Sequence, residues 1–323
     1  MDKISVIVQR KWPVAADIVA LELVAARGEC LPPFSAGAHI DVFLDAPDGE
    51  RPIIRQYSLC NAPEETDRYI LGVKLEPQSR GGSRAVHERL REGAPLTISA
   101  PRNHFPLHED ADMTVLFAAG IGITPLLAMT QSLRQAHRNF RLDYFARSPE
   151  HVAFADRLIA ADDAASIHIH TGASVEDTER AICDVLAGIG PAAHVYACGP
   201  GVFMDMVGRH AAGRVPRAHF HVEHFAAPAA PASGREVFEV VAARSGVRCM
   251  VRADRSIVET LREHGVEIDV SCEQGVCGTC ITRVISGVPD HRDIYLSDDE
   301  RAAGDQITPC CSRALSGTLE LDI

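Results

Sequence analysis

Cysteines grouped near the C-terminal end give this sequence its clearest chemical signal. The run CEQGVCGTC places Cys272, Cys277 and Cys280 in C-x4-C-x2-C spacing, and Cys310 follows after 29 intervening residues. This is the spacing of plant-type [2Fe–2S] sites, in which thiolates bind iron and the bridging sulfide completes the cluster. Because Cys310 and Cys311 are adjacent, spacing alone leaves the fourth ligand open. We therefore predict a [2Fe–2S] cluster bound by the first three cysteines and by one of the adjacent pair.

The loop that carries these cysteines also contains Gly275 and Gly278. Glycine lets a loop close tightly and turn backbone N–H groups toward the cluster sulfurs, which tunes the cluster potential. A structural zinc site is the simpler alternative. Such sites pair two short Cys or His clips, and only one clip is present here. The pattern favours the iron–sulfur cluster over zinc.

Length and composition limit the classes of protein to consider. A chain of 323 residues suits two or three domains, and 46% hydrophobic with 24% charged residues is typical of globular proteins. The net charge of −12 argues against a nucleic-acid partner, because a phosphate backbone would be repelled. We find no apolar run of membrane-spanning length and no secretion signal, so we expect a cytoplasmic protein with no membrane partner. Ten cysteines in such a protein indicate cofactor binding or burial rather than disulfides.

Changes in the hydrophobic pattern divide the chain into three predicted domains. Residues 1–107 contain short alternating apolar segments between turns, which is typical of an antiparallel β-barrel. Residues 108–225 alternate apolar strands with helical segments, which predicts an α/β domain with a parallel sheet. A stretch rich in Ala and Pro predicts a linker over 226–236. Residues 237–323 begin with a hairpin and a helix that lead into the cysteine loop.

Two S-x-x-E patterns predict helix starts in this last domain. Ser256 with Glu259, and Ser297 with Glu300, have the spacing of capping boxes. Gly265 is placed to end the first of these helices.

The first domain contains two segments that fit a site for a phosphate group. In the strand RQYSL, Arg55 and Tyr57 would face one side and Ser58 the other. In the later run RGGS, Ser83 is the predicted N-cap of the helix AVHERLRE, and Gly93 is the residue expected just past its end. A helix N-terminus favours an anion, although each motif alone also fits an ordinary strand or turn.

The second domain contains a glycine-rich turn between a strand and a helix. In the run AAGIGITP, Gly120 and Gly122 follow the strand, and Thr124 and Pro125 are the predicted N-cap and first helical residue. Glycines at this point let a dinucleotide pyrophosphate approach the backbone. The later run YACGP ends another strand at the ligand edge of the sheet, where Cys198 is either close to the ligand or a buried thiol.

The run HFHVEH contains His219, His221 and His224. Its spacing matches neither the H-E-x-x-H pattern of zinc proteases nor its inverted form. We therefore interpret these side chains as solvent-exposed histidines of a strand, with a mononuclear metal site as the lesser alternative.

These motifs, in this order, resemble the phthalate dioxygenase reductase and vanillate O-demethylase reductase family. The resemblance covers essentially the whole chain and rests on RQYSLCNAP, RGGSRAVHE, AAGIGITPLLAM, YACGP, CEQGVCGTC, PDHRD and CCSRA. It implies an FMN-binding β-barrel, a nicotinamide-binding α/β domain and a β-grasp ferredoxin domain. It also implies that Cys310 is the fourth iron ligand, because the family's ligand precedes x-S-R-A, and that Cys311 packs beside the cluster.

The resemblance further implies which residues bind the flavin and the nicotinamide. Arg55 would bind the FMN phosphate, Tyr57 would pack on the flavin ring, and Ser58 would reach its N5 edge. The other implied residues are Gly81, Gly82 and Ser83 at the FMN phosphate, and Gly120, Gly122, Thr124, Pro125, Cys198, Gly199 and Pro200 at the nicotinamide dinucleotide.

Three residues are implied at the reacting rings, namely Ser58, Cys198 and Phe225. Phe225 stands where related reductases present an aromatic ring to the flavin, although packing at a strand end explains it equally well from sequence alone. One departure from the family is Ala119, which stands where most relatives have glycine.

The sequence thus predicts the reductase component of a two-component Rieske-type aromatic oxygenase or O-demethylase. NADH would reduce FMN, and the cluster would pass single electrons to a terminal oxygenase component. The alternatives are a reductase that serves a cytochrome P450 or another oxygenase, and a non-catalytic redox sensor, which would need neither a flavin nor a hydride donor. NADPH is the alternative to NADH, since Arg147 and Ser148 follow a strand where a 2′-phosphate could lie.

The charge of the last domain points to a protein partner. Residues 237–323 contain 9 arginines, no lysine and 15 acidic residues, a net charge of −6. This asymmetry suits a partner with a basic patch around its own redox centre.

Overall fold

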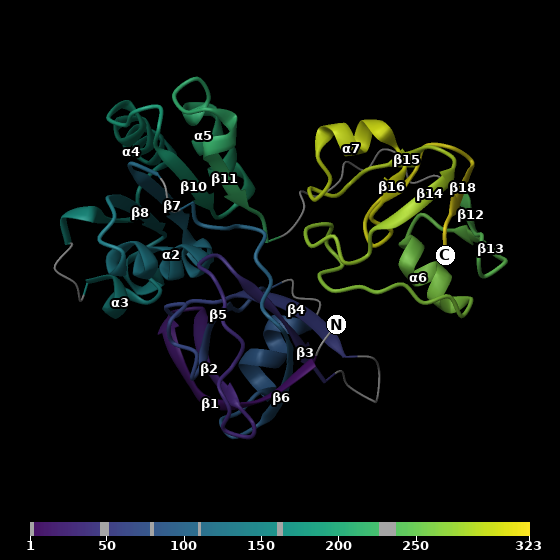
Figure 1. Ribbon diagram of the computed structural model, residues 1–323, viewed down its shortest axis with the longest axis horizontal. Coiled ribbons are helices and arrows are strands. Elements are labelled where there is room, and N and C mark those ends of the chain that lie inside the picture. Colours follow the sequence, from purple (N-terminus) through teal and green to yellow (C-terminus); the bar gives the residue numbers. More distant parts are fainter. Residues whose placement is uncertain (1–2, 46–51, 78–80, 109–110, 160–163, 226–236) are drawn as a thin grey trace. The chain divides into compact units, whose positions relative to one another are not determined.

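A computed structural model describes most of the chain, and the described part forms two compact units, Met1–Glu223 and His224–Ile323 (Figure 1). The described residues are 3–45, 52–77, 81–108, 111–159, 164–225 and 237–323. The predicted linker, 226–236, lies outside them. Among the helices of these residues, none combines the length and apolar character that a membrane span requires.

An antiparallel sheet makes up the N-terminal half of the first unit. The described strands are ordered β4-β3-β6-β1-β2-β5. They are β1 (Lys3–Ala15), β2 (Ile18–Ala25), β3 (His39–Leu44), β4 (Ile53–Ser58), β5 (Tyr69–Lys74) and β6 (Pro95–Ser99). A bridge between Leu59 and Leu71 joins the two outer edges, and alternate residues such as Val6, Leu21 and Ile40 are fully buried inside. The alternating apolar pattern therefore builds the closed antiparallel sheet that was predicted.

The helix predicted after RGGS begins differently from the expectation. Its N-cap is Gly81, whose φ of 94° lies in the left-handed region, and α1 (Gly82–Arg84) follows. Ser83 lies inside this helix, and its Oγ accepts a hydrogen bond of 3.1 Å from the N–H of Glu76. The predicted N-cap role of Ser83 is wrong, because the glycine makes the turn that starts the helix.

The end of this helix also differs. A π-helical turn, Ala85–Arg89, continues α1, and Leu90 is already extended. Gly93 lies farther along, in the turn before β6, where it has a φ of 79°. It does not end the helix as predicted.

A parallel sheet makes up the rest of the first unit. The described strands are ordered β11-β10-β7-β8-β9, with α2 covering one face and α4 and α5 the other (Figure 1). The elements are β7 (Thr114–Ala119), α2 (Ile123–Gln135), β8 (Phe140–Ala146), α3 (Ala155–Ile159), β9 (Ile167–Thr171), α4 (Val175–Ala187), β10 (His194–Cys198), α5 (Gly201–Ala211) and β11 (Phe220–Glu223). Leu116 and Ala118 face α2 while Val115 and Phe117 face α4 and α5, which explains why β7 is apolar throughout.

The start of α2 corrects a second capping prediction. A 3-10 turn, Gly120–Gly122, separates β7 from α2, and Gly122 is the N-cap. Thr124 and Pro125 are therefore the second and third helical residues. Thr124 Oγ1 donates a 2.9 Å hydrogen bond to the carbonyl oxygen of Ile121 inside the extra turn. The N-cap role predicted for Thr124, and the first position predicted for Pro125, are wrong.

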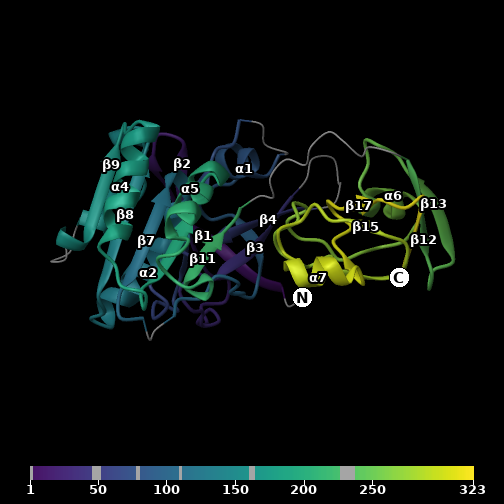
Figure 2. The ribbon, with the colours of Figure 1, turned by 90° about the horizontal axis from the view of Figure 1, so that it is seen from above.

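The second unit is a mixed sheet packed against one helix (Figure 2). The strand order in its described residues is β13-β12-β18-β14-β16, and β15 pairs separately with β17. The elements are β12 (Phe238–Ala242), β13 (Val247–Val251), α6 (Ile257–Glu263), β14 (Thr282–Ser286), β15 (Pro289–Asp290), α7 (Asp298–Ala303), β16 (Gln306–Ile307), β17 (Arg313–Ala314) and β18 (Thr318–Leu321).

Both capping boxes predicted for this unit are confirmed. The side chain of Ser256 accepts from the N–H of Glu259, Ser297 accepts from that of Glu300, and both glutamates bond back to the serine N–H. Gly265 follows α6 with a φ of 80°, as predicted for the residue that ends the helix.

Candidate functional site

The cysteine thiols of the second unit converge in two pairs. Cys272 hydrogen-bonds to Cys277, and Cys280 hydrogen-bonds to Cys310. The first three are buried and Cys310 is partly buried. A cluster of two irons needs two thiolates for each iron, so this arrangement fits a [2Fe–2S] group. Cys311 lies beside Cys310 and also hydrogen-bonds to it.

Backbone N–H groups of the loop point at these sulfurs. The N–H of Gln274 lies 3.3 Å from Cys272 Sγ, and the N–H of Gly275 bonds to Cys310. The hydrogen bond from Cys272 lowers the pKa of Cys277 to about 5. The same hydrogen bond, together with burial, raises the pKa of Cys272, and the hydrogen bond to Cys280 raises that of Cys310. Cys277 is therefore the sulfur of its pair that most readily takes the thiolate form, which is the form that binds iron.

The two loop glycines are required by the geometry. Gly275 and Gly278 have φ values of 73° and 68°. A Cβ atom on Gly278 would lie 2.3 Å from the ring of Tyr295, and one on Gly275 would lie 2.6 Å from Cys311 Sγ. The prediction that these glycines let the loop close is confirmed, and Cys311 packs against the loop.

Asp293 positions this loop and was not singled out from the sequence. Its buried carboxylate accepts hydrogen bonds from the N–H groups of Tyr295, at 3.1 Å, and Leu296, at 2.8 Å. The Ser312 hydroxyl donates to its other oxygen at 3.4 Å. These bonds hold the Tyr295 ring over Gly278. The residue stands in the run PDHRD, which served only as a mark of resemblance.

Arg55 and the glycines predicted at the flavin phosphate meet beside β4, an outer strand of the first sheet. A Cβ atom on Gly82 would lie 2.6 Å from Cγ and 2.7 Å from Nε of Arg55, so the guanidinium stem crosses the backbone of the turn. Gly81, at positive φ, begins that turn. An arginine beside a glycine turn is a fitting arrangement for a phosphate group. Tyr57 lies near, and burial raises its pKa to about 12.

The residues predicted at the dinucleotide meet at the carboxyl edge of the parallel sheet. A Cβ atom on Gly122 would lie 2.1 Å from the carbonyl oxygen of Cys198, so only glycine allows the turn before α2 to pack this closely against the end of β10. A Cβ atom on Gly199 would lie 2.8 Å from the methyl group of Ala119. Because Gly199 has no Cβ atom, it leaves room for the methyl group of Ala119, the residue that departs from the family. Pro200 is the N-cap of α5.

The ends of strands from both sheets join at one point of the first unit. Ser58, at the end of β4, hydrogen-bonds to the carboxyl group of Glu223, at the end of β11. Glu223 pairs in register with Cys198, whose side chain is fully buried. Burial raises the pKa of Glu223 to about 8, an effect that the Ser58 hydrogen bond partly offsets. Burial likewise raises the pKa of the Cys198 thiol.

Sequence reasoning missed Glu223. The residue stands in HFHVEH, where only the histidines drew attention. The available signal was its place as the last residue of a strand beside YACGP, since side chains at the carboxyl edge of a parallel sheet face the ligand.

The remaining predicted residues lie as follows. Phe225 is 39% exposed and belongs to the second unit, so its role at the flavin stays a prediction. Arg147 and Ser148 follow β8, and Ser148 Oγ lies 2.6 Å from Nδ1 of His151.

The prediction that the histidines of HFHVEH are solvent-exposed is wrong. His219 and His221 are both partly buried, and their rings stack against or near His194. His224 is likewise partly buried and falls in the second unit. Short strands at a sheet edge bury such rings when a connecting segment crosses over them.

Comparisons with known proteins agree with this arrangement. A family model described as a 2Fe-2S iron-sulfur cluster binding domain matches residues 240–315. The vanillate O-demethylase oxidoreductase of Pseudomonas sp. (strain HR199 / DSM 7063) is 45% identical over 99% of this chain and 100% of its own length.

Two solved structures cover the same extent of the chain. The structure of phthalate dioxygenase reductase, described as modular for electron transfer from pyridine nucleotides to [2Fe–2S], is 40% identical over 99% of this chain and 98% of its own, with a TM-score of 0.76. A type IV self-sufficient cytochrome P450 monooxygenase is 35% identical over 99% of this chain and 41% of its own, with a TM-score of 0.80. The predicted fold class is thereby confirmed.

Proposed function

This chain belongs to the family of the vanillate O-demethylase oxidoreductases and phthalate dioxygenase reductases, and on that premise we propose that it carries electrons from NADH, through FMN and a [2Fe–2S] cluster, to a terminal oxygenase. The oxygenase that we propose is of the Rieske type and acts on an aromatic acid. The proposed boundaries of the three domains are those predicted from the sequence.

The observation that carries this proposal is the junction of Ser58, Cys198 and Glu223. A hydride donor and its acceptor must lie in contact, and each has its own binding sheet. The hydrogen bond between Ser58 and Glu223 joins the end of a strand from one sheet to the end of a strand from the other. Such a junction suits the meeting of a nicotinamide ring with a flavin ring.

When bound, FMN converts the two-electron hydride of NADH into single electrons that a [2Fe–2S] cluster can carry. Arg55 and the turn of Gly81, Gly82 and Ser83 would hold its phosphate, and Tyr57 and Ser58 would contact its ring. Phe225 is proposed to cover the ring from the segment that follows β11.

Ser58 and Glu223 are proposed to hold a proton at this junction. With a pKa of about 8, Glu223 keeps its proton at neutral pH. Its Oε2 is buried and lacks a hydrogen-bond partner among the described residues. A neutral carboxyl group beside the Ser58 hydroxyl avoids placing a second negative charge where hydride arrives.

The turn of Gly120 and Gly122, with Thr124 and Pro125 behind it, would receive the pyrophosphate of the dinucleotide. Cys198, Gly199 and Pro200 would border its nicotinamide. We propose NADH over NADPH because the Ser148 hydroxyl is already hydrogen-bonded to His151, and so is not poised for a 2′-phosphate.

In the second unit, Cys272, Cys277, Cys280 and Cys310 are proposed to bind the cluster. The acidic surface of this unit would select the partner. Its net charge of −6 over residues 237–323 favours encounter with a basic patch on the oxygenase.

The test is NADH-dependent electron delivery by the purified holoprotein. We expect fast reduction of ferricyanide or cytochrome c, faster with NADH than with an equal concentration of NADPH. We also expect reduction of a Rieske oxygenase, and slower reduction when salt screens the charges. A protein that reduces none of these acceptors with either nucleotide would overturn the proposal.

A cytochrome P450 partner is the second candidate. It is favoured by the match to the self-sufficient P450 monooxygenase, in which a region similar to this whole chain makes up 41% of the protein. Side-by-side reduction of a purified Rieske oxygenase and a purified P450 separates the two candidates.

A further inference from the structure

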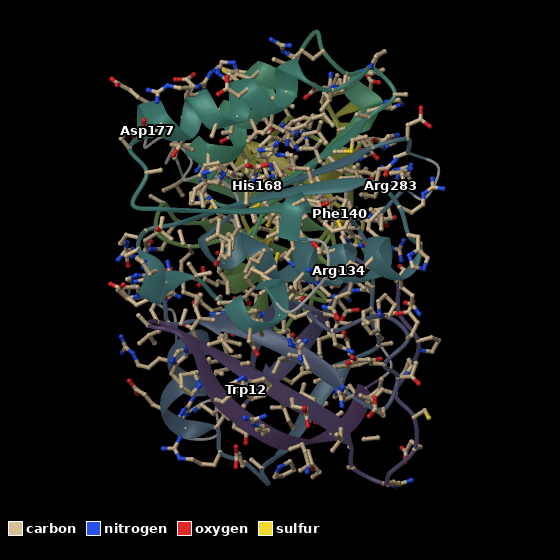
Figure 3. All side chains as sticks on the ribbon, turned by 90° about the vertical axis from the view of Figure 1, so that its left-hand side faces the viewer. Trp12, Arg134, Phe140, His168, Asp177 and Arg283 are labelled. Carbon is tan, nitrogen blue, oxygen red and sulfur yellow. The ribbon has the colours of Figure 1, made fainter. Side chains whose placement is uncertain are left out.

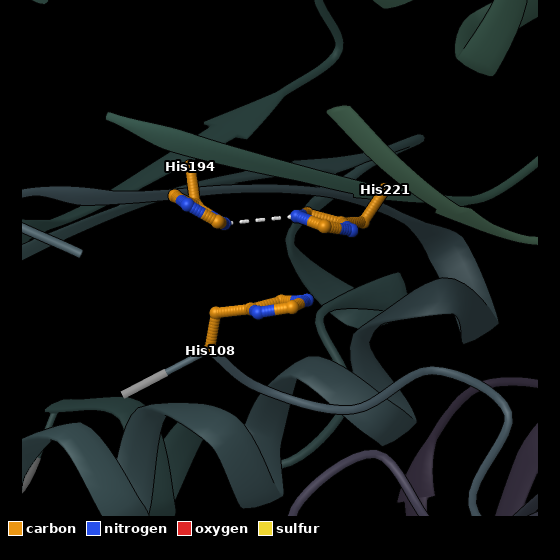
Figure 4. A group of neighbouring side chains, drawn as sticks. All are labelled: His108, His194 and His221. Atoms are coloured by element: carbon orange, nitrogen blue, oxygen red, sulfur yellow. Dashed lines mark hydrogen bonds between the residues drawn. The ribbon is translucent and has the colours of Figure 1, made fainter. Parts of the chain in front are cut away.

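Three histidines cluster on the first unit and include none of the residues of the junction of Ser58 and Glu223. His194 begins β10 and His221 lies on the neighbouring β11, while His108 comes from the segment that leads toward β7 (Figure 4). Cys198 ends the strand that His194 begins, so these two residues lie about 13 Å apart along β10, whereas His221 lies two residues, or about 7 Å, before Glu223 on β11. The cluster therefore borders the proposed redox site but shares no residue with it.

The ring nitrogens of the cluster lie close enough to share one ion. One nitrogen from each of His108, His194 and His221 lies within 4.8 Å of the other two. The closest pair is Nδ1 of His194 and Nε2 of His221, at 3.0 Å. Two imidazoles on one tetrahedral zinc ion hold their nitrogens about 3.3 Å apart, given bonds of about 2.0–2.1 Å. The nitrogens of His194 and His221 would therefore have to move apart only slightly to bind one zinc ion.

Contacts outside the cluster fix the segment that carries His108. The N–H of His108 donates a 2.9 Å hydrogen bond to Oη of Tyr196, and Tyr196 donates to the carbonyl oxygen of Pro106 at 3.3 Å. The Tyr196 ring also stacks on His221 at 4.5 Å, and meets Phe105 edge-on. One tyrosine thus sets the position of ligands from two segments, as supporting groups do in metal sites.

Ring stacking and hydrogen bonding hold the three rings together without an ion. The His108 ring stacks on His221 at 4.7 Å, and Nδ1 of His194 and Nε2 of His221 share one proton in a 3.0 Å hydrogen bond. A bound ion would take the place of this hydrogen bond.

We propose that His108, His194 and His221 form a binding site for a divalent transition-metal ion, with Zn²⁺ as the ion of best fit. Three imidazole nitrogens suit zinc and leave a fourth position for water. His108 is exposed, so the ion can enter from solvent and the ring can rotate toward the other two. The bound ion would tie the segment before β7 to the edge formed by β10 and β11.

Zinc titration of the holoprotein with its iron–sulfur cluster intact tests the proposal. We expect calorimetry to detect one equivalent of Zn²⁺. X-ray absorption at the zinc edge should show imidazole nitrogen at about 2.0 Å and no sulfur at the thiolate distance of about 2.3 Å.

Matched variants locate the ion. His108→Ala and His221→Gln should each weaken zinc binding by at least about tenfold. His168→Gln, on β9 at the opposite edge of the sheet, should leave it unchanged (Figure 3). NADH-dependent flavin reduction should be the same in His108→Ala and His168→Gln, which also shows that these two variants fold. His108 is exposed, so its variant provides the test even if His221→Gln is unstable.

Three results would overturn the site. They are the absence of saturable zinc binding, a sulfur-containing shell, and an affinity that both histidine variants leave unchanged. A loss of binding in Cys183→Ser would instead place the ion at the Cys183 and His210 pair, whose Sγ and Nδ1 atoms lie 3.3 Å apart.

Discussion

The cysteine loop and the junction of Ser58, Cys198 and Glu223 are both proposed redox sites, but the chain builds them in opposite ways. Three of the loop's ligands lie within nine consecutive residues, and local glycines at positive φ give the loop its shape. The junction takes one residue each from β4, β10 and β11, which only the sheet topology brings together. A local site is robust to changes elsewhere, whereas an assembled site depends on how closely its strands approach.

The largest expected effect comes from removing a cluster ligand. Cys280→Ala should abolish the visible absorbance of the cluster and electron delivery to an oxygenase, while NADH still reduces the flavin. The neighbouring Cys311→Ala serves as the control and should retain the cluster, because Cys311 packs beside the loop rather than holding iron. Iron content, absorption spectra and oxygenase reduction measure both. Loss of the cluster in Cys311→Ala, or its retention in Cys280→Ala, would contradict the ligand assignment.

The second-largest effect comes from a substitution that disturbs the assembled junction and leaves the cysteine loop intact. In Gly122→Ala the new methyl group would lie 2.1 Å from the carbonyl oxygen of Cys198, so the turn before α2 must move away from the end of β10. We expect a cost of about 1–3 kcal/mol in stability and a raised KM for NADH, with the cluster spectrum unchanged. Gly190→Ala is the matched control, because a Cβ atom there meets no atom within 4 Å. An unchanged KM in Gly122→Ala would show that close packing of this turn against β10 does not matter to nucleotide binding.

The smallest effect concerns the pH dependence contributed by Glu223. Its pKa is about 8 in the folded protein and about 4.5 when exposed, so between these values the folded state holds a proton that the unfolded state has lost. Stability therefore falls as pH rises through this window, by at most about 1.4 kcal/mol per pH unit from this group. Glu223→Gln should remove that slope, and Glu29→Gln, at an exposed carboxyl, should keep it. Urea unfolding from pH 5 to 9 provides the comparison; equal slopes in all three proteins would contradict the raised pKa.

The same contrast explains how far the sequence could predict the structure. Strand and helix positions followed from hydrophobic periodicity, and the capping boxes of Ser256 and Ser297 formed as predicted because a capping box is a local set of hydrogen bonds. The N-cap roles of Ser83 and Thr124 failed because preceding glycines, Gly81 and Gly122, started those helices first.

Features that depend on distant partners were harder to predict. The sequence marks Glu223 only as the last residue of a strand, since its buried position depends on β4 reaching β11. His108 and His194 drew no attention because their neighbour, His221, lies on another segment. Asp293 was visible only as part of a motif, and its hydrogen bonds to Tyr295 and Leu296 require the folded loop.

Rapid mixing with NADH under anaerobic conditions follows the order of electron transfer through the protein. We expect flavin absorbance to fall before the cluster becomes reduced, and we expect protein stripped of FMN but retaining its cluster to accept no electrons from NADH. Reduction of the cluster by NADH at the native rate in the flavin-free protein would contradict this order.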